Sequence, residues 1–280
     1  AFDQTELEFR QLAGRLNQPQ ALWYSLLIRS ARALNSGQFD AAGELAREFV
    51  LIGTRIGDAN AFHSAMAQRL VHGAESGDFQ DILRASEEAR RRYPVFFGWR
   101  ASRCWGLALQ GRVEEAARDL QALVPIAEEG VPRKMDWPTS IVLLANTVHL
   151  LNARDLAERL LALVAPLSGH NIVLGLCVMS WGSAVRYAGL LSETLGRRGD
   201  AESLIEQAIE ENARSGAEPW AAHCEYDLAR IRIRHGKSPK ASSELAERAL
   251  ARARRLGMRV LEERASILIG RTAMQRKKSR

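Results

Sequence analysis

The sequence repeats one tripeptide, Gly37-Gln38-Phe39, as Gly77-Asp78-Phe79 and again as Gly111-Arg112-Val113. Each copy places a glycine, a polar residue and an apolar residue between two stretches of helical pattern. Glycine suits this position because a helix often ends in a left-handed residue just beyond its last turn. The tripeptide therefore predicts a tight turn between two helices.

Looser versions of this turn follow at Asn152-Ala153, Gly199-Asp200 and Gly236-Lys237, so successive turns lie 34 to 47 residues apart. A second recurring element, Arg-x-Gly, ends other helix-like stretches: Arg55-Ile56-Gly57, Arg214-Ser215-Gly216 and Arg255-Leu256-Gly257. Its arginine is expected in a last helical turn, where a positive charge interacts favourably with the helix dipole. A period near 40 residues is typical of arrays of helical hairpins.

The stretches between the turns carry apolar residues at intervals of three and four, as in Ala201, Leu204, Ile205, Ala208 and Ile209. Such spacing places one apolar stripe on a helix. Sustained polar and apolar alternation is hard to find, so no sheet is expected. Many core positions on the second helix of each pair are alanine, which lets neighbouring helices approach closely. The predicted fold is all-α, an α-solenoid forming a right-handed superhelix of tetratricopeptide-like hairpins.

We expect one elongated domain over residues 1–280. Its predicted hairpins lie near 20–55, 58–93, 97–130, 136–168, 171–216 and 218–257, followed by a capping helix at 259–275 and a basic tail at 276–280. The fifth hairpin is long because residues 172–195 are expected to form one extended first helix.

The composition limits the cellular compartment and the cysteine chemistry that we expect for this chain. Apolar runs such as 172–179 are too short to span a bilayer, and the N-terminus has no signal region. Three cysteines, Cys104, Cys177 and Cys224, stand at wide spacings and form no paired motif. They are expected to be buried thiols in a reducing cytoplasm. No membrane contact is expected.

Charge is unevenly distributed along the chain, whose net charge is +6. From Arg230 to the end there are 16 Lys and Arg against 4 Asp and Glu, while the first 229 residues hold 23 and 29. A basic C-terminal end of this kind could bind phosphates or an acidic partner; the alternative is a solvated capping face.

Three fragments imitate catalytic motifs and fail on inspection. Gly236-Lys237-Ser238 lacks the upstream glycine of a phosphate-binding loop. His223-Cys224-Glu225 lacks the second cysteine motif of zinc deaminases, and Ser180-Trp181-Gly182 lacks the first glycine of a nucleophile elbow. We therefore expect no catalytic residue, no metal, no cofactor and no enzymatic activity.

In stacked hairpins the first helices usually line a concave groove. Polar and aromatic residues on the predicted first helices are therefore the candidate binding residues: Asn146, His149, Arg186, Tyr187, His223, Tyr226 and Arg230. The alternative is that His149 and Tyr187 pack in the core and that Arg186 and Arg230 are ordinary surface charges.

The chain resembles the C-terminal helical-repeat region of large bacterial signalling regulators of the MalT type. The resemblance is carried by Trp137-Pro138, the stretches at 183–191 and 226–230, Gly216-Ala217-Glu218-Pro219-Trp220, and the closing stretch at 249–258. In that family a nucleotide cyclase, kinase-like or LuxR-type DNA-binding domain is joined to an AAA/STAND ATPase and then to tetratricopeptide-like repeats. The ATPase and cyclase motifs are absent from this chain.

The resemblance implies a sensor or scaffold arm that restrains an ATPase switch. Our leading hypothesis is a non-enzymatic binding module that takes a protein segment, a small effector or the regulator's own ATPase or output domain in its groove. The alternative is a nucleic-acid-associated regulatory arm using the basic C-terminal end.

Overall fold

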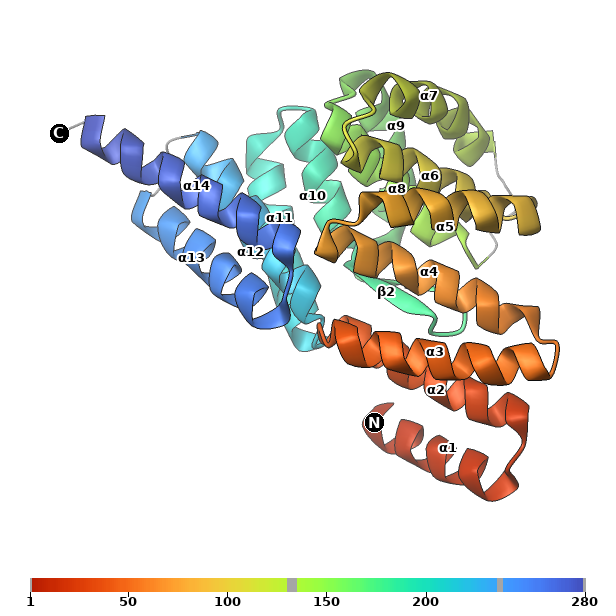
Figure 1. The fold of residues 1–280 in the computed structure, drawn as a ribbon. Helices are drawn as coiled ribbons and strands as arrows, with labels where there is room; N and C mark the ends of the chain where they lie inside the picture. The colour runs from red at the N-terminus through yellow and green to blue at the C-terminus, as the bar shows by residue number, and fades with distance from the viewer. Residues whose placement is uncertain (1, 130–134, 236–238, 279–280) are drawn as a thin grey trace.

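The computed structural model describes residues 2–129, 135–235 and 239–278 (Figure 1). These ranges are almost entirely α-helical, as predicted. The helices are α1 (Phe2–Leu16), α2 (Pro19–Asn35), α3 (Phe39–Arg55), α4 (Ala59–Ser76), α5 (Phe79–Arg92), α6 (Phe97–Leu109), α7 (Val113–Glu129), α8 (Trp137–Leu151), α9 (Arg154–Val164), α10 (Ala184–Thr194), α11 (Arg198–Arg214), α12 (Glu218–Arg234), α13 (Pro239–Leu256) and α14 (Arg259–Lys278). A short 3-10 helix, Ala165–Leu167, follows α9.

The helices form an α-solenoid of hairpins. Consecutive helices pack in pairs from α2 with α3 to α12 with α13, and α14 covers α13 (Figure 1). The second helices bury small residues such as Ala42, Ala116 and Ala201, whereas first helices contribute large ones such as Trp23 and Trp99. Small residues on one side of each contact allow the close stacking that a repeat array needs.

The repeated glycines end helices as predicted. Gly37 and Gly77 adopt φ values of 77° and 85°, in the left-handed region that penalises other residues. The Arg-x-Gly elements also lie where expected, since Arg55 and Arg214 are the last residues of α3 and α11. One turn was assigned wrongly: Gly199 lies inside α11, and the turn glycine is Gly196. The turn at 236–238 lies outside the described residues.

The predicted extended helix over 172–195 is wrong. Its first half is an antiparallel β-hairpin of β1 (Asn171–Leu174) and β2 (Met179–Ser183), and α10 begins only at Ala184. Positive φ values at Gly175, Cys177 and Gly182 interrupt any helix in this segment. The expectation that no residues would form a sheet therefore fails here, and the first helix of the fifth pair is short.

Three smaller corrections concern the termini and one cysteine. The helix α1 precedes the first predicted hairpin and has no counterpart in the sequence-based assignment. The closing helix α14 runs to Lys278, so residues 276–278 of the predicted tail are helical, and residues 279–280 lie outside the described ones. Cys104 and Cys224 are buried as expected, but Cys177 is exposed because it lies in the turn of the β-hairpin.

The β-hairpin lies against the inner helices of the solenoid. Its strands pack on α2, α8, α10, α11 and α12. Trp181 is buried between Trp105 of α6 and Trp220 of α12, with ring centroids 5.3 and 5.5 Å apart. The chain thus fills part of its own concave side with a segment inserted between α9 and α10.

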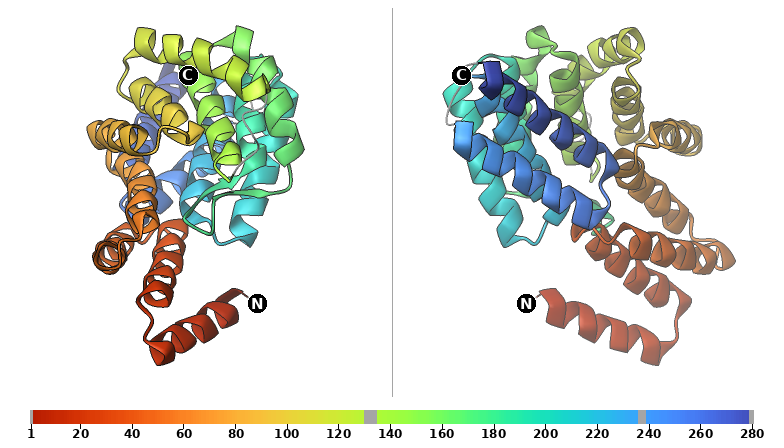
Figure 2. Two further views of the ribbon diagram at one scale, coloured as in Figure 1. Left: turned by 90° about the vertical axis from the view of Figure 1, so that its right-hand side faces the viewer. Right: turned by 60° about the vertical axis from the view of Figure 1, so that its left-hand side comes forward.

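The solenoid curves until its early and late hairpins touch (Figure 2). The helix α4 packs on α14, and the side chain of Asn35 donates a hydrogen bond of 3.4 Å to the carbonyl of Ser215, 180 residues away. Among the residues that the structure describes, no helix combines the length and apolarity required to cross a membrane.

Candidate functional site

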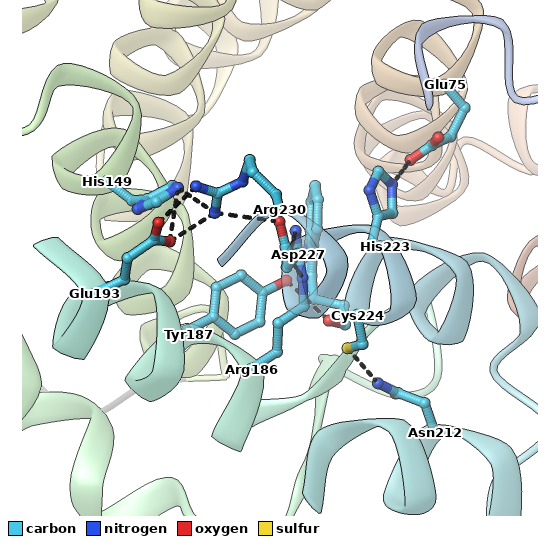
Figure 3. A network of polar contacts seen from close by, with 11 residues as sticks. Glu75, His149, Arg186, Tyr187, Glu193, Asn212, His223, Cys224, Asp227 and Arg230 are labelled. Atoms are coloured by element: carbon cyan, nitrogen blue, oxygen red, sulfur yellow. Dashed lines mark hydrogen bonds and ion pairs between the residues drawn. The ribbon is translucent and has the colours of Figure 1, made fainter. Parts of the chain in front are cut away.

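Four of the seven candidate residues, His149, Arg186, Tyr187 and Arg230, lie on neighbouring inner helices and join one buried polar network or its immediate border (Figure 3). At its centre, Nε and Nη2 of Arg186 on α10 both lie 2.9 Å from Oδ2 of Asp227 on α12. The two side chains are only 8% and 6% exposed. Arg186 is therefore neither a groove residue nor a surface charge, because it is one half of a buried ion pair.

A second pair extends the network toward α8. Arg230 of α12 donates two hydrogen bonds of 2.6 Å to the carboxylate of Glu193 on α10. Nε2 of His149 lies 3.3 Å from Nη2 of Arg230, and its Nδ1 lies 3.2 Å from the hydroxyl of Thr194. A bidentate geometry of this kind is strong and directional, so it locks α8, α10 and α12 in one register.

The protonation states in the network follow from burial and the arginine charges. Burial, together with the positive charge of Arg230, lowers the pKa of His149 to about 4. Burial opposes ionisation of Asp227, but the charges of Arg186 and Arg230 outweigh it and hold the pKa of this carboxyl below its usual value. At neutral pH the network therefore contains a neutral imidazole between paired charges.

Tyr187 and Cys224 belong to the core beside the network. The hydroxyl of Tyr187 donates a hydrogen bond of 2.8 Å to the carbonyl of Trp181, and burial raises its pKa. The side chain of Asn212 donates to Sγ of Cys224 at 3.4 Å, and burial raises the pKa of this thiol to about 12. Neither group is available as a nucleophile, because the reactive form of a cysteine or tyrosine is the anion.

The remaining candidate residues lie outside this network. His223 lies 2.8 Å from Oε1 of Glu75 on α4, which joins the early and late hairpins (Figure 3). Tyr226 is half-buried beside Leu256, and burial raises its pKa. Asn146 is half-buried on α8 and belongs to no contact of the network. The deaminase-like fragment His223-Cys224-Glu225 does not form one site, since Glu225 pairs with Arg248 and Arg252 of α13.

The network therefore stabilises the repeat stack through side chains that are paired with one another. Its carboxylates are paired with guanidinium groups, and among the described residues no cluster of three or more His, Cys, Asp or Glu could hold a metal ion. Sequence reasoning missed both acidic partners, Glu193 and Asp227. The available signal was Asp227, which stands three residues before Arg230 on the same helix.

A different feature on the inner face has room for a ligand. It is a partly open cavity of about 130 Å³ lined by α2, α4, α6, α8, the turns before α6 and α8, and the tip of the β-hairpin. We call it the inner cavity. Its wall is mostly apolar and aromatic and consists of Trp23, Tyr24, Leu27, Asn60, His63, Ser64, Ala67, Leu70, Phe96, Gly98, Trp99, Ser102, Met135, Asp136, Thr139, Leu174, Gly175, Leu176, Val178 and Met179.

Two polar groups on this wall have no partner. Nε1 of Trp23 and the hydroxyl of Thr139 are buried and make no hydrogen bond in the structure, and their residues are 0% and 3% exposed. An unpaired buried donor costs free energy unless something supplies an acceptor. Both atoms are almost completely covered by the surrounding protein, so they lie within the packed wall and do not open onto the cavity.

His63 and Asp136 complete the polar part of the wall. Nε1 of Trp99 donates to Nε2 of His63 at 3.0 Å, and the His63 ring stacks on Tyr93 with centroids 4.6 Å apart. Burial lowers the pKa of His63, so this ring is neutral at pH 7. Oδ2 of Asp136 accepts from the backbone N–H of Gly98 at 2.9 Å.

No candidate from the sequence lies on the inner cavity. Its residues come from four helices and from a hairpin that the periodicity predicted as helix, and each alone has the pattern of an ordinary core position. The stacked aromatic residues Trp23, Tyr93 and Trp99 were the only available signal.

Part of the basic C-terminal end is paired with acidic residues in space. Arg232 pairs with Glu202 and Glu206 of α11, and Arg252 and Arg255 of α13 pair with Glu218 of α12. These acidic partners precede residue 230 in the chain, so pairing between helices offsets part of the charge asymmetry seen along the sequence.

Comparisons with known proteins do not assign this chain to a family. The chain matches no family model. A search of curated proteins finds none with significant sequence similarity.

Proposed function

We propose that this chain is a non-enzymatic binding module that takes a protein segment or a small effector on the inner face of its repeat stack. One observation carries the proposal: the inner cavity has a mostly apolar and aromatic wall that includes a few polar side chains, among them His63 and Asp136. Ligand sites are typically concave and mostly apolar with a few polar groups that orient the ligand.

The buried network supports the same function from the other side. The pairs Arg186–Asp227 and Arg230–Glu193 join α10 to α12, and Arg230 contacts His149 of α8. Because α8 also lines the inner cavity, one of its walls is held in place before a ligand arrives. A preformed receptor binds without spending free energy on ordering its own chain. In this proposal the module is a tetratricopeptide-like sensor arm of a bacterial cytoplasmic regulator, and its partner is an effector or the regulator's own ATPase or output domain.

A site-specific photocrosslinking experiment tests the location. Leu176, at the tip of the β-hairpin, borders the inner cavity and is 66% exposed, so benzoylphenylalanine at this position leaves the core intact. The matched control is the same substitution at Leu51 on the second helix α3, which is 61% exposed.

We expect irradiation in the producing cells to give defined adducts at position 176 and none at position 51, detected by intact-mass spectrometry for small effectors and by gel shift for proteins. Adducts confined to position 51, or none at position 176, would exclude the inner face as the binding surface.

A further inference from the structure

Asp136 gives the wall of the inner cavity a negative charge. Among the described residues that line this space, it is the only Asp, Glu, Lys or Arg. His63 adds no positive charge at pH 7, because burial lowers its pKa. The charge of Asp136 opposes this effect of burial on the pKa of His63. The carboxylate therefore acts on the aromatic wall and has no counter-charge on it.

One oxygen of this carboxylate is engaged and the other is open. Oδ2 accepts the hydrogen bond of 2.9 Å from the backbone N–H of Gly98. Oδ1 makes no hydrogen bond or ion pair with the described part of the chain, and it is not fully covered as Nε1 of Trp23 and Oγ1 of Thr139 are. Asp136 as a whole is only 7% exposed, so little water can solvate this oxygen. A cation stabilises a carboxylate in such a position, whereas a neutral or anionic occupant leaves it without a partner.

Aromatic rings form much of the remaining wall. Phe96 and Trp99 lie beside His63, with ring centroids 4.8 and 5.2 Å from that of the imidazole. Trp23 and Tyr24 of α2 add a stacked pair whose centroids are 3.9 Å apart. Tyr24 and Phe96 are only half-buried, so part of each ring remains uncovered. The negative π face of such rings attracts a cation, most strongly where water is excluded.

The size and apolarity of the cavity limit the kind of cation. Its volume is about 130 Å³. An apolar cavity of roughly 150 Å³ holds one benzene molecule, and a tetramethylammonium ion has fewer non-hydrogen atoms than benzene. A primary ammonium fits this wall poorly, because its N–H donors are strongly hydrated and would meet mostly apolar surface. A quaternary ammonium has no donor to satisfy, so it loses less when it leaves water.

We propose that the inner cavity binds a small organic monocation of the quaternary ammonium class. The methyl groups of the ligand lie against Tyr24, Phe96 and Trp99, and its positive charge faces Oδ1 of Asp136. This inference rests on the proposed function and names the class of effector for the same face. It favours a small effector over a protein segment as the occupant of the cavity.

An NMR titration of the full chain with tetramethylammonium chloride tests the ligand class. The indole N–H signal of Trp99 reports on the cavity wall, whereas those of Trp105 and Trp220 report on buried positions outside it. We expect a saturable shift at Trp99 with a Kd on the order of 1 mM, which is within reach of so small a ligand. The other two signals should change little. Sodium chloride at equal ionic strength controls for screening.

Two comparators separate charge from shape. tert-Butanol is a neutral molecule of similar shape, and methylammonium has the same charge but carries N–H donors. Each should bind at least about tenfold more weakly than tetramethylammonium. The neutral molecule loses the attraction to the carboxylate and the rings, and methylammonium gives up a stronger hydration shell.

A pair of aspartate variants tests the site. Asp136→Asn keeps an oxygen for the N–H of Gly98 but removes the charge, and it should weaken tetramethylammonium binding at least about tenfold. The matched control is Asp78→Asn. Asp78 also accepts from a backbone N–H at the start of a helix, that of Asp81 at 3.0 Å, but it lies outside the cavity. This control removes the same charge from the molecule and should leave the affinity unchanged.

A phenylalanine variant tests the aromatic wall and does not depend on the fold tolerating a change at Asp136. Phe96→Leu replaces a half-buried ring with an aliphatic side chain and should weaken tetramethylammonium binding about threefold or more. It should not weaken the binding of tert-butanol. Phe79→Leu is the matched control, because Phe79 is also half-buried but lies outside the cavity.

The proposal is overturned if the Trp99 signal of the folded chain shows no saturable shift up to about 20 mM tetramethylammonium, about twentyfold above the expected Kd. It is equally overturned if tert-butanol or methylammonium binds as tightly as tetramethylammonium. Equal affinities of Asp136→Asn and Asp78→Asn, or of Phe96→Leu and Phe79→Leu, would also overturn it.

These results separate from those on the proposed function. Adducts at position 176 without tetramethylammonium binding would reject the ligand class and keep the binding face. Tetramethylammonium binding to the purified chain without adducts in cells would keep the cation site and reject the proposed function.

Discussion

Removing one partner of the buried pair Arg186–Asp227 should produce the largest single loss of stability in this molecule. In Asp227→Leu the guanidinium group of Arg186 keeps its charge at about 8% exposure and loses its carboxylate. Breaking a buried pair in this way typically costs about 3–5 kcal/mol, because an uncompensated charge remains in a poorly solvated site. Arg230 also loses an oxygen of Asp227 at 3.6 Å, but it stays paired through Glu193, so most of the loss falls on Arg186.

The double variant Arg186→Met with Asp227→Leu should recover most of that loss. Both desolvation penalties disappear together, and apolar replacements of similar size are often neutral or stabilising in such positions. The matched control is Arg197→Met, which breaks the exposed pair Arg197–Glu158, whose side chains are 45% and 61% exposed. Pairs of that kind contribute no more than about 1 kcal/mol.

Urea denaturation followed by circular dichroism measures the free energy of unfolding of the single and double variants as a thermodynamic cycle. Because a solenoid can open in parts, hydrogen exchange of α10 and α12 should show where the stability is lost. The reasoning is refuted if Asp227→Leu costs less than about 1 kcal/mol, like a surface pair, or if the double variant loses as much as the two single variants together.

Three further outcomes are expected. Acidification from pH 7 to 5 should lower the free energy of unfolding by about 2 kcal/mol through His149. The pKa of His149 falls from 6.5 to about 4 on folding, so only the unfolded chain takes up the proton in this pH range. Urea titrations at the two pH values measure the effect, and His149→Gln should remove that part of the pH dependence. Gln68→Leu deletes the hydrogen bond of 2.8 Å from its side chain to the carbonyl of Val178 and should speed chymotryptic cleavage of the hairpin tip severalfold; unchanged cleavage would mean that the bond does not hold the tip. On α3, Gly53→Ala should destabilise the protein by about 1–3 kcal/mol, because a Cβ there would lie 2.1 Å from the Cβ of Ala61. Gly43→Ala on the same helix should instead stabilise the protein by about 0.5–1 kcal/mol, because its Cβ would meet only the flexible end of an arginine side chain. Thermal unfolding of both variants gives the comparison.

The helical repeats could be predicted because their signals are local. Gly37 and Gly77 end helices through their own backbone freedom, and the arginines of Arg-x-Gly lie in last helical turns. The β-hairpin escaped prediction because Ile172 and Met179 have the apolar character of a buried helix as well as of a buried strand. Periodicity cannot separate the two in short apolar runs.

The candidate site was predicted in part. Choosing first helices brought His149, Arg186 and Arg230 into one region, because helices of the same type stack beside one another in a repeat array. Their role could not be inferred, since it depends on acidic partners 37 and 41 residues away in the sequence. The sequence also could not show that Glu218 pairs with Arg252 and Arg255 across helices, which offsets part of the positive charge of the C-terminal end.

The sequence alone determined the all-α class, the period and most turns, because helix formation and helix ends depend on residues within a few positions of one another. The tertiary structure alone decided that Arg186 and Asp227 form a buried pair, that the β-hairpin enters the concave side and that four helices and this hairpin line one cavity. Burial and pairing are properties of side chains brought together from distant repeats, and the curvature that brings them together results from the packing of the whole stack.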